Sequence, residues 1–473
     1  MSHLSGGTDE GLMILTRVNK GSGDWNETIF PGPDGCETIL WPRIATGGVD
    51  HSVIHMLALT PLNVLYQGME GALLYSQSTD GGATWVQQNV ILEGMTSNEY
   101  TGIAGDTYEI QAQDNNVAIL VGDPWCDLML FKSTDGGDNW VKTIIWEHPY
   151  PMWNGTPTDT FYCADGAHHF AFDPDGMVHV VFGINRALSV DGTAQFWFPG
   201  VGGIGYWNED RPTFSNNINA LCPYANCPDS ELIDDYSLIG WTQDINNNGE
   251  IDVLDDWGTY YLGFSSMPQI HIDHNSRICV AFSSVTEIYD NGIQNYRHLW
   301  VRFSSDGDFW EPFYDLSPDP LHPFNEFVFP SVATWSDNDF YLVYQYDHEP
   351  GLAVKGDEDP YIENTIRFMK VPILGVSIEE NEFPNPNVDA DVLQNVPNPF
   401  NDKTTIGVNV RKATNLTLEV ANVMGQKVKT IDVGFVLPGM NKIEVDGSTL
   451  NPGLYFYTVK AGSSAITRKM IVE

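Results

Sequence analysis

The stretch from residue 244 to residue 255, DINNNGEIDVLD, places oxygen-bearing side chains at the spacing of a twelve-residue calcium loop. Gly249 stands at the sixth position, where such loops turn sharply, and the last position is aspartate rather than the usual glutamate. We therefore predict a structural Ca²⁺ ion, with an empty acidic turn as the alternative. The predicted ligands are the side chains of Asp244, Asn246, Asn248, Asp252 and Asp255 and the backbone carbonyl of Glu250.

A second group of residues has side chains that could transfer protons or neutralise a carboxylate. Imidazole and phenol groups act as general bases and acids, paired carboxylates serve hydrolases, and arginine stabilises anions. Several of these residues stand at or just before the start of a predicted strand. Neighbouring residues of a strand point to opposite faces, so one histidine of the pair 168–169 must face the axis and the other an adjacent sheet. The candidates are His51, Glu109, Asp165, His168, Arg186 and Tyr206.

The elements that must position these residues are marked by a recurring turn. STDGGATW at residues 78–85 returns as STDGGDNW at residues 133–140, and a shorter version, SSDGDFW, occupies residues 304–310. We expect the aspartate to accept backbone N–H bonds, the glycines to supply positive φ, and the tryptophan to pack beneath the turn. The structural positions are Ser78, Asp80, Gly82, Trp85, Ser133, Asp135, Gly137, Trp140, Ser304, Asp306 and Trp310.

A second kind of hairpin alternates with these turns. Two hairpins in each period of roughly 57 residues make a four-stranded sheet, and such repetition predicts an all-β chain with a β-propeller. We favour six blades, with five or seven as alternatives, and expect N-terminal strands to close the ring. Residues 216–262 are predicted to be an insertion that carries the calcium loop. The second hairpins begin at His51, Tyr108, His168, Gln269 and Pro330.

The turns and their setting resemble the Asp-box (BNR) propellers, a group that includes the sialidases. The resemblance covers residues 11–375 and implies that the turns lie on the blade periphery, while ligands bind near the central axis. A sialidase would need an arginine triad, a Tyr–Glu pair and an acid–base Asp. Arg43 and Ile44 keep part of the first arginine motif, but alanine replaces the proline that follows, and nothing in the sequence selects a triad.

Three functions stay open at this point. A propeller lyase would use His51 or His168 with Tyr206 as base and acid and Arg186 against a uronate. A glycosidase would instead pair two carboxylates, for example Asp50 with Asp165 or Glu109. The third possible function is non-catalytic: the histidines hydrogen-bond to neighbouring blades, and the propeller binds a glycan or a protein through its aromatic-rich rim. Because no complete catalytic set is evident, we favour binding, with polysaccharide cleavage as the alternative.

The C-terminal part changes character from about residue 393. The motifs NPFN at 398–401, GQ at 425–426, PGLYFY at 452–457 and RKMIV at 468–472 occur in order. Together they resemble the type IX secretion sorting domain of Bacteroidetes-type bacteria. The resemblance implies a small Ig-like β-sandwich over residues 393–473 that engages the type IX secretion machinery. It also implies that the protein is secreted or attached to the outer membrane at the cell surface. An adhesive Ig-like module is the alternative.

Charge separates the two parts. Residues 393–473 hold nine Lys or Arg and six Asp or Glu. The first 392 residues hold 13 Lys or Arg and 57 Asp or Glu. So negative a surface excludes nucleic acid as a partner. Residues 376–392, acidic and proline-rich, are predicted to be a linker. We also expect Cys222 and Cys227 to bridge a small loop, and no segment to span a membrane. The N-terminus lacks a signal-peptide core, so we expect a mature form.

Overall fold

The chain divides into two compact units, Met1–Val376 and Ser377–Glu473. The computed structural model describes residues 2–5, 8–191, 195–197, 200–246, 248–254, 260, 262–317, 324–337, 339–353, 364–373, 390–392, 395, 398, 400–410, 412–422, 426–437, 439–462 and 464–472. Most of the predicted linker, residues 376–392, lies outside these ranges.

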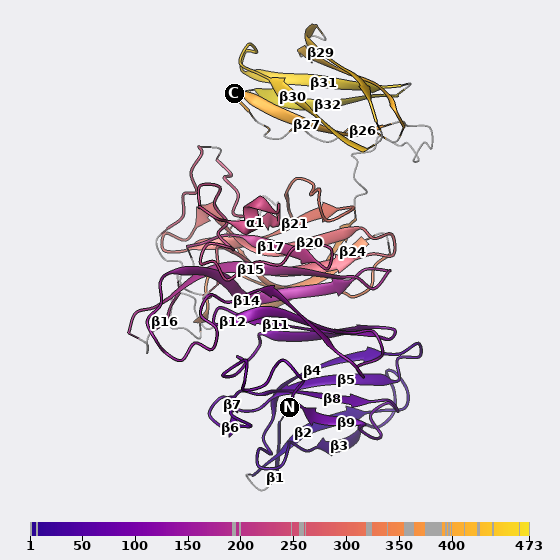
Figure 1. Ribbon diagram of the computed structural model, residues 1–473, viewed down its shortest axis with the longest axis vertical. Helices are drawn as coiled ribbons and strands as arrows, with labels where there is room; N and C mark the ends of the chain where they lie inside the picture. Colours follow the sequence, from indigo (N-terminus) through magenta and orange to yellow (C-terminus); the bar gives the residue numbers. More distant parts are fainter. Residues whose placement is uncertain are drawn as a thin grey trace. The chain divides into compact units, whose positions relative to one another are not determined.

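The first unit is a series of antiparallel sheets that follow one another along the chain (Figure 1). The N-terminal sheet consists of β1 (Ser2–Ser5), β2 (Thr8–Thr16) and β3 (Asn26–Phe30). Blade 1 contains β4 (Leu40–Gly47), β5 (Val53–Leu59), β8 (Leu73–Ser78) and β9 (Gln87–Val90). In the chain segment that connects β5 to β8, β6 (Leu65–Tyr66) pairs with β7 (Met69–Glu70) as a separate two-stranded sheet. Blade 2 contains β10 (Tyr108–Gln113), β11 (Asn116–Asp123), β12 (Cys126–Ser133) and β13 (Val141–Trp146).

The following blades vary this plan. Blade 3 contains β14 (Phe161–Phe172), β15 (Val178–Ser189), β17 (Ile204–Asn208) and β18 (Leu238–Gly240), with β16 (Gln195–Trp197) beside β15. Blade 4 contains β19 (Ser265–Ile272), β20 (Ile278–Asp290), β21 (Asn295–Ser304) and β22 (Tyr314–Asp315). Blade 5 contains β23 (Glu326–Val332), β24 (Asp339–Asp347) and β25 (Thr365–Pro372). The segment predicted as an insertion, 216–262, therefore supplies β18 to blade 3, together with the short helix α1 (Glu231–Asp234) and the disulfide Cys222–Cys227.

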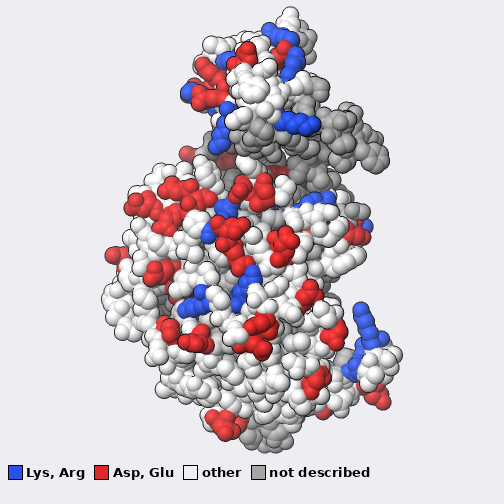
Figure 2. Space-filling model, turned by 45° about the vertical axis from the view of Figure 1, so that its right-hand side comes forward, with Lys and Arg blue, Asp and Glu red and all other residues white. Residues whose placement is uncertain are grey.

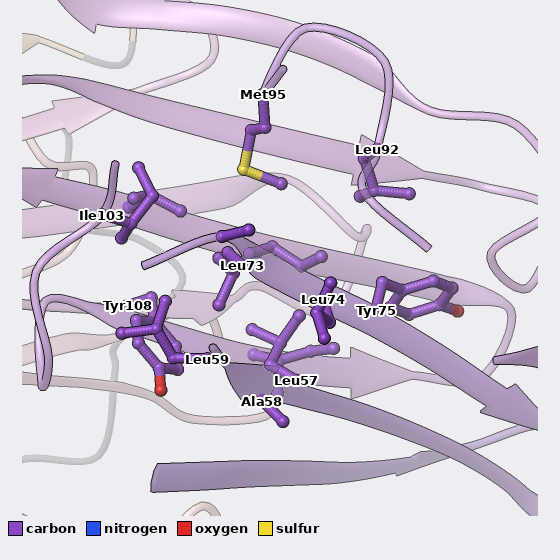
Figure 3. Close-up of a cluster of buried hydrophobic side chains, with 14 of the residues drawn as sticks. Leu57, Ala58, Leu59, Leu73, Leu74, Tyr75, Leu92, Met95, Ile103 and Tyr108 are labelled. Atoms are coloured by element: carbon purple, nitrogen blue, oxygen red, sulfur yellow. The ribbon is translucent and has the colours of Figure 1, made fainter. Parts of the chain in front are cut away.

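The middle strands of the blades are buried on both faces. Every described residue of β8 is buried, as are seven of the eight residues of β11. The sequence of a strand that is covered on both sides is typically rich in apolar residues, because each of its faces packs on a neighbouring sheet. Figure 3 shows a cluster of buried side chains in which Leu57 and Leu59 of β5 and Leu73 of β8 lie with Tyr108 of blade 2. The core is thus divided into layers between successive blades.

The three Asp–Gly–Trp turns have the predicted bonding. Asp80 Oδ1 accepts the N–H of Thr84 at 2.8 Å, and Asp135 Oδ1 accepts that of Asn139 at 2.9 Å. In the shorter third turn Asp306 Oδ1 accepts the N–H of Phe309 at 2.9 Å. The serine that opens each turn adds a bond, since its Oγ accepts a glycine N–H at 2.8–2.9 Å. The glycines all have φ between +72° and +96°.

The tryptophans of these turns join blades 1, 2 and 4 to the sheet that precedes each of them. Each lies edge-to-face against an aromatic ring on the third strand of the preceding sheet. The pairs, with their ring-centroid distances, are Phe30–Trp85 at 4.7 Å, Tyr75–Trp140 at 5.1 Å and Tyr206–Trp310 at 5.2 Å. The N-terminal sheet therefore stacks on blade 1 in the same way that blade 1 stacks on blade 2.

The first strands of all five blades line one cavity. A shared cavity means that the blades are arranged about a common axis, and the unit is a β-propeller. The five blades and the N-terminal sheet form a series of six sheets, within the predicted range of five to seven. Closure of the ring by the N-terminal strands stays a prediction.

The C-terminal unit is a small β-sandwich. One sheet consists of β26 (Ala390–Val392), β27 (Lys403–Val410) and β30 (Gly439–Asp446), and the other of β29 (Lys427–Val436), β28 (Thr414–Asn422), β31 (Gly453–Ala461) and β32 (Ser464–Val472). Apolar side chains of both sheets form its core. The motif at 398–401 is bonded to the last strand: the N–H of Ile471 donates to Asn398 Oδ1 at 2.7 Å, and the N–H of Phe400 donates to the Ile471 carbonyl at 3.1 Å.

Replacing glycines of the second turn tests the contact between blades 1 and 2. Gly136 and Gly137 both have positive φ, but a Cβ at Gly137 would lie 2.3 Å from the Tyr75 hydroxyl, whereas one at Gly136 would meet nothing within 4 Å. We expect Gly136→Ala to lower the free energy of unfolding by about 1 kcal/mol and Gly137→Ala by about 3 kcal/mol or more, measured by chemical denaturation. Equal losses would contradict the proposed role of this contact.

Candidate functional site

The axial cavity has a volume of about 370 Å³ and lies toward the C-terminal ends of the innermost strands. Strands β4, β10, β14, β19 and β23 line it, so five blades contribute. Its apolar lining consists of Ile, Val, Ala and Phe side chains. Among the described residues that line it, none is Asp, Glu, Lys or Arg. The polar lining residues are Thr46, His51, Gln111, Gln113, His169, His271 and Thr334.

Side chains of the inner strands are bonded to the backbone of the next blade. The N–H of Phe170 donates to Glu109 Oε1 at 2.9 Å, and the N–H of Ile270 donates to His169 Nδ1 at 3.2 Å. Gln111 also donates from Nε2 to the Phe170 carbonyl. These bonds fix the register of blades 2, 3 and 4 around the cavity. Burial raises the pKa of Glu109 to about 8 against the opposing effect of the bond from Phe170.

The histidine pair divides between two neighbours, as the alternation of strand residues predicts. His168 places its Nε2 3.1 Å from the Thr107 carbonyl of blade 2, whereas His169 lines the cavity. Burial lowers the pKa of His168 to about 4 and that of His169 to about 3, the latter also because of the nearby His168 and His271. Both rings are therefore neutral at physiological pH.

Asp165 is buried between blades 3 and 4. Its Oδ2 accepts a bond from Ser266 Oγ at 2.5 Å, and its Oδ1 accepts the Ala167 N–H at 2.9 Å. The carboxylate packs on Gly183, where a Cβ would lie 2.2 Å from Oδ2. Burial raises the pKa of Asp165 to about 6, although the bond from Ser266 opposes this. Asp165 thus joins two blades, and it is absent from the described cavity lining.

The remaining candidates are spread over different strands. His51, in the turn after β4, is exposed, has φ +57° and lines the cavity. Arg186 lies on β15, with its guanidinium 5.9 Å from the Tyr162 ring. Tyr206 lies on the third strand of blade 3, fully buried, with its hydroxyl 2.7 Å from His179 Nδ1. Of the six candidates, the structure brings only His51 to the cavity, and Tyr206 belongs to the packing between blades.

A second buried polar group lies at the opposite, N-terminal end of the inner strands. Glu326 accepts bonds from the Tyr260 hydroxyl at 2.9 Å and from the Arg297 N–H at 2.5 Å. Burial raises the pKa of Glu326 to about 8, and the cavity beside the group, about 30 Å³, has room for one water molecule. The Arg297 guanidinium donates to the carbonyls of Gly263 and Phe264. This group holds blades 4 and 5 together.

Sequence reasoning did not identify Glu326, Tyr260 or His271 as site residues. Tyr260 falls within the predicted insertion, residues 216–262, for which the sequence predicts no blade strand. His271 is the third residue of the hairpin that begins at Gln269, and the same alternation that distinguished His168 from His169 could have been applied to it. Its Nε2 lies 2.7 Å from Ser336 Oγ of blade 5.

The predicted calcium loop folds around its own oxygen atoms. Asp244 accepts the N–H groups of Asn248 at 3.2 Å and Gly249 at 2.8 Å, and Gly249 has φ +88°. Asn248 donates from Nδ2 to Asp252 Oδ2 at 2.6 Å. Asp255 lies outside the described residues. Among those that are described, no three His, Cys, Asp or Glu side chains form a metal-binding group.

Glu287 anchors this loop from β20. The side chain is 1% exposed, and its two oxygens accept the N–H groups of Asn246 at 2.6 Å and Asp252 at 3.4 Å. One buried carboxylate therefore bonds to the backbone at the third and the ninth positions of the loop. The oxygen-only donor set of Asp244, Asn246, Asn248 and Asp252 suits a hard cation such as Ca²⁺.

Blade 5 carries stacked aromatic rings on an exposed face. Trp335 stacks on Tyr341 and Tyr341 on Phe368, each with ring centroids 6.0 Å apart. Trp335 is 65% exposed and Phe368 is 66% exposed. Elsewhere the surface is strongly acidic, and Figure 2 shows Asp and Glu spread over the visible face.

Comparison with known proteins identifies the C-terminal unit. Residues 396–473 match the family described as secretion system C-terminal sorting domain. The chain is therefore a secreted or outer-membrane-attached cell-surface protein. In the described residues no helix is long and apolar enough to cross a membrane. No curated protein matches the chain.

Several solved structures are similar to the chain at low identity. A Penicillium chrysogenum α-L-arabinanase complexed with arabinobiose has 13% identity and a TM-score of 0.30, over 68% of this chain and 82% of that one. A thermostable family-43 glycoside hydrolase has 10% identity and a TM-score of 0.30, over 70% and 90%. Trypanosoma rangeli sialidase in complex with the inhibitor DANA has 11% identity and a TM-score of 0.25, over 96% and 87%. Similarities this low transfer no activity to this chain.

The raised pKa of Glu109 predicts a pH-dependent loss of stability. Between about pH 4.5 and pH 8 the unfolded chain ionises this carboxyl group while the folded protein keeps it protonated, so the free energy of unfolding falls as the pH rises. Glu109→Gln keeps an acceptor for the Phe170 N–H and removes this effect. We expect the variant to exceed the wild type by about 1–2 kcal/mol at pH 8 and to equal it at pH 4, measured by chemical denaturation.

The exposed Glu27 provides the matched control for this substitution. Glu27→Gln should follow the wild-type stability at every pH. Parallel pH profiles for Glu109→Gln and the wild type would show that Glu109 is ionised in the folded protein.

Proposed function

We propose that residues 1–376 form the binding module of a secreted or surface-attached protein, which takes a glycan or a protein partner at the axial cavity. The observation that carries this proposal is the convergence of five inner strands on one cavity of about 370 Å³. Volumes of this size are typical of ligand pockets, and the ends of propeller axes are common ligand sites.

Binding is favoured over catalysis by the position of the titratable groups. A glycosidase needs two carboxyl groups that face the scissile bond, and a lyase needs a base, an acid and a cation beside the uronate. The carboxyl groups of Glu109 and Asp165 instead accept bonds that join blades. Tyr206 is buried against Trp310.

Polysaccharide cleavage stays the second candidate because of one observation. Glu109 and Asp165 have raised pKa values, about 8 and 6, and acid catalysts require carboxyl groups that stay protonated near neutral pH. Movement of a blade would be needed to free either group for a substrate.

We also propose that the loop from Asp244 to Asp255 binds Ca²⁺ in a structural role. Asp244, Asn246, Asn248 and Asp252 would supply side-chain oxygens, Glu250 its backbone carbonyl, and Asp255 a further carboxylate. The support is the oxygen-only donor set and the clamp that Glu287 provides. The ion would offset the repulsion between acidic groups in this segment, which begins four residues after the end of β18.

A screen of the full chain against neutral and acidic polysaccharides tests the proposed function. We expect saturable binding by calorimetry, with no increase in reducing ends or unsaturated products over time. Ala171→Phe, which fills the cavity, should abolish binding, whereas Ala83→Phe in the exposed first turn should leave it unchanged. Accumulating product would establish the enzyme instead, and equal binding by both variants would place the site elsewhere.

Calcium binding is tested by thermal unfolding with and without the ion. We expect Ca²⁺ to raise the Tm of the wild type and to leave that of Asp244→Ala or Asp252→Ala unchanged, because ligands that bind only the folded state stabilise it. Glu250→Gln serves as the control, since only its backbone carbonyl is proposed as a ligand, and it should keep the shift. If the aspartate variants respond as the wild type does, this loop is not the calcium site.

A further inference from the structure

We propose that the axial cavity binds an uncharged carbohydrate, the end of a neutral glycan chain, and that the His169 Nε2–H donates a hydrogen bond to a sugar hydroxyl. This inference rests on the proposed function and names its ligand class. It follows from the composition of the lining and from the tautomer that the backbone imposes on His169.

The lining has polar groups without fixed charge. Its described members offer threonine hydroxyls at Thr46 and Thr334, an amide at Gln111 and imidazoles at His169 and His271. Anionic ligands are normally held by arginine, lysine or helix N-termini, and cationic ligands by carboxylates or aromatic cages. A cavity with neither set of groups is suited to a neutral ligand that has many hydrogen-bonding groups. The negative field of the whole unit adds a further barrier to acidic sugars.

The tautomer of His169 follows from its backbone partner. The N–H of Ile270 donates to His169 Nδ1 at 3.2 Å, so Nδ1 is the acceptor of the ring. A neutral imidazole then carries its hydrogen on Nε2. Within the described part of the chain, no group is bonded to Nε2. The buried ring has a pKa of about 3, so it stays neutral and keeps this tautomer over the physiological pH range.

The apolar lining completes the match to a sugar. Pyranose and furanose rings expose C–H groups between their hydroxyls, and such faces are stabilised by contact with apolar side chains. Ile110 and Ala112 of β10 alternate with Gln111, and Ala171 and Phe172 of β14 follow His169 by two and three residues. The described lining therefore offers both apolar side chains and hydrogen-bonding groups, the two kinds of contact that a sugar ring requires.

Calorimetric titration of the full chain tests the ligand class. The probes are cellohexaose, xylohexaose and laminarihexaose as neutral oligosaccharides, and hexagalacturonate and sialyllactose as acidic ones. We expect at least one neutral probe to bind and both acidic probes to bind at least tenfold more weakly. Tighter binding of an acidic probe would overturn the inference and leave glycan binding intact, whereas failure of every polysaccharide in the broader screen would remove the proposed glycan function itself.

Substitution of His169 tests its role as donor. His169→Leu should weaken binding of the neutral probe about five- to tenfold, within the range expected for the loss of one neutral hydrogen bond. His169→Gln, whose amide can accept from Ile270 and also donate to the ligand, should stay within threefold of the wild type. His274→Leu, at an exposed position, is the control and should not change the affinity. Unchanged affinity in folded His169→Leu would overturn the assignment.

A second lining position keeps the test valid if His169→Leu does not fold. Thr334 is exposed in the connection after β23, so Thr334→Val removes only a hydroxyl group. We expect this variant to lose three- to fivefold in affinity for the same probe. Loss of binding in both His169→Gln and Thr334→Val, with the melting temperature of the wild type, would support the cavity but contradict the specific role of the Nε2 donor.

Discussion

The stacking of one blade on the next is the constraint on which the rest of the first unit depends. A four-stranded sheet of this sequence has two apolar faces, and only a neighbour on each side removes both from water. The edge-to-face pairs Phe30–Trp85, Tyr75–Trp140 and Tyr206–Trp310 recur with nearly the same geometry. They fix the outer part of three of the interfaces, those of the N-terminal sheet with blade 1, blade 1 with blade 2 and blade 3 with blade 4. Side chains such as Glu109 and His169 fix inner parts of the interfaces through bonds to the backbone of the next blade.

The same constraint explains the character of the central cavity. Inner-strand side chains such as Glu109 and His168 reach the backbone of the adjacent blade and bond to it. Residues on the opposite face of the same strands are left around the axis. The pair His168 and His169 shows the division within two consecutive residues, since the first bonds to blade 2 and the second lines the cavity. What remains on the axis is a neutral lining, and the carboxyl groups of Glu109 and Asp165 lie between blades.

Local patterns in the sequence predicted the fold well. The three Asp–Gly–Trp turns have the expected aspartate bonds and positive φ values because short-range chemistry determines them. The C-terminal sandwich was likewise marked by motifs that the structure brings together, as in the bonds between residues 398–400 and Ile471. Strand alternation also predicted that the two histidines would separate. It could not predict which of them would face the axis, because that depends on bulges such as the register shift between Ala164 and His168.

The candidate site was predicted less completely, for a physical reason. Histidine, tyrosine, aspartate and glutamate can act in catalysis, and they can equally hydrogen-bond one blade to the next. The sequence alone does not distinguish these two roles. Tyr206, a candidate acid, is buried with its hydroxyl bonded to His179. Glu326 and Tyr260 are partners only because chain segments 66 residues apart meet. The blade strand within the predicted insertion, residues 216–262, could not be recognised from the sequence, since the three residues of β18 are too few to show a strand pattern.

The most direct measurement of the central claim is an experimental structure of the full chain bound to a neutral oligosaccharide. The account predicts a sugar ring enclosed by β4, β10, β14, β19 and β23, with one hydroxyl oxygen within hydrogen-bonding distance of His169 Nε2. A ligand bound only on the outer surface, with the axial cavity filled by protein side chains, would contradict it.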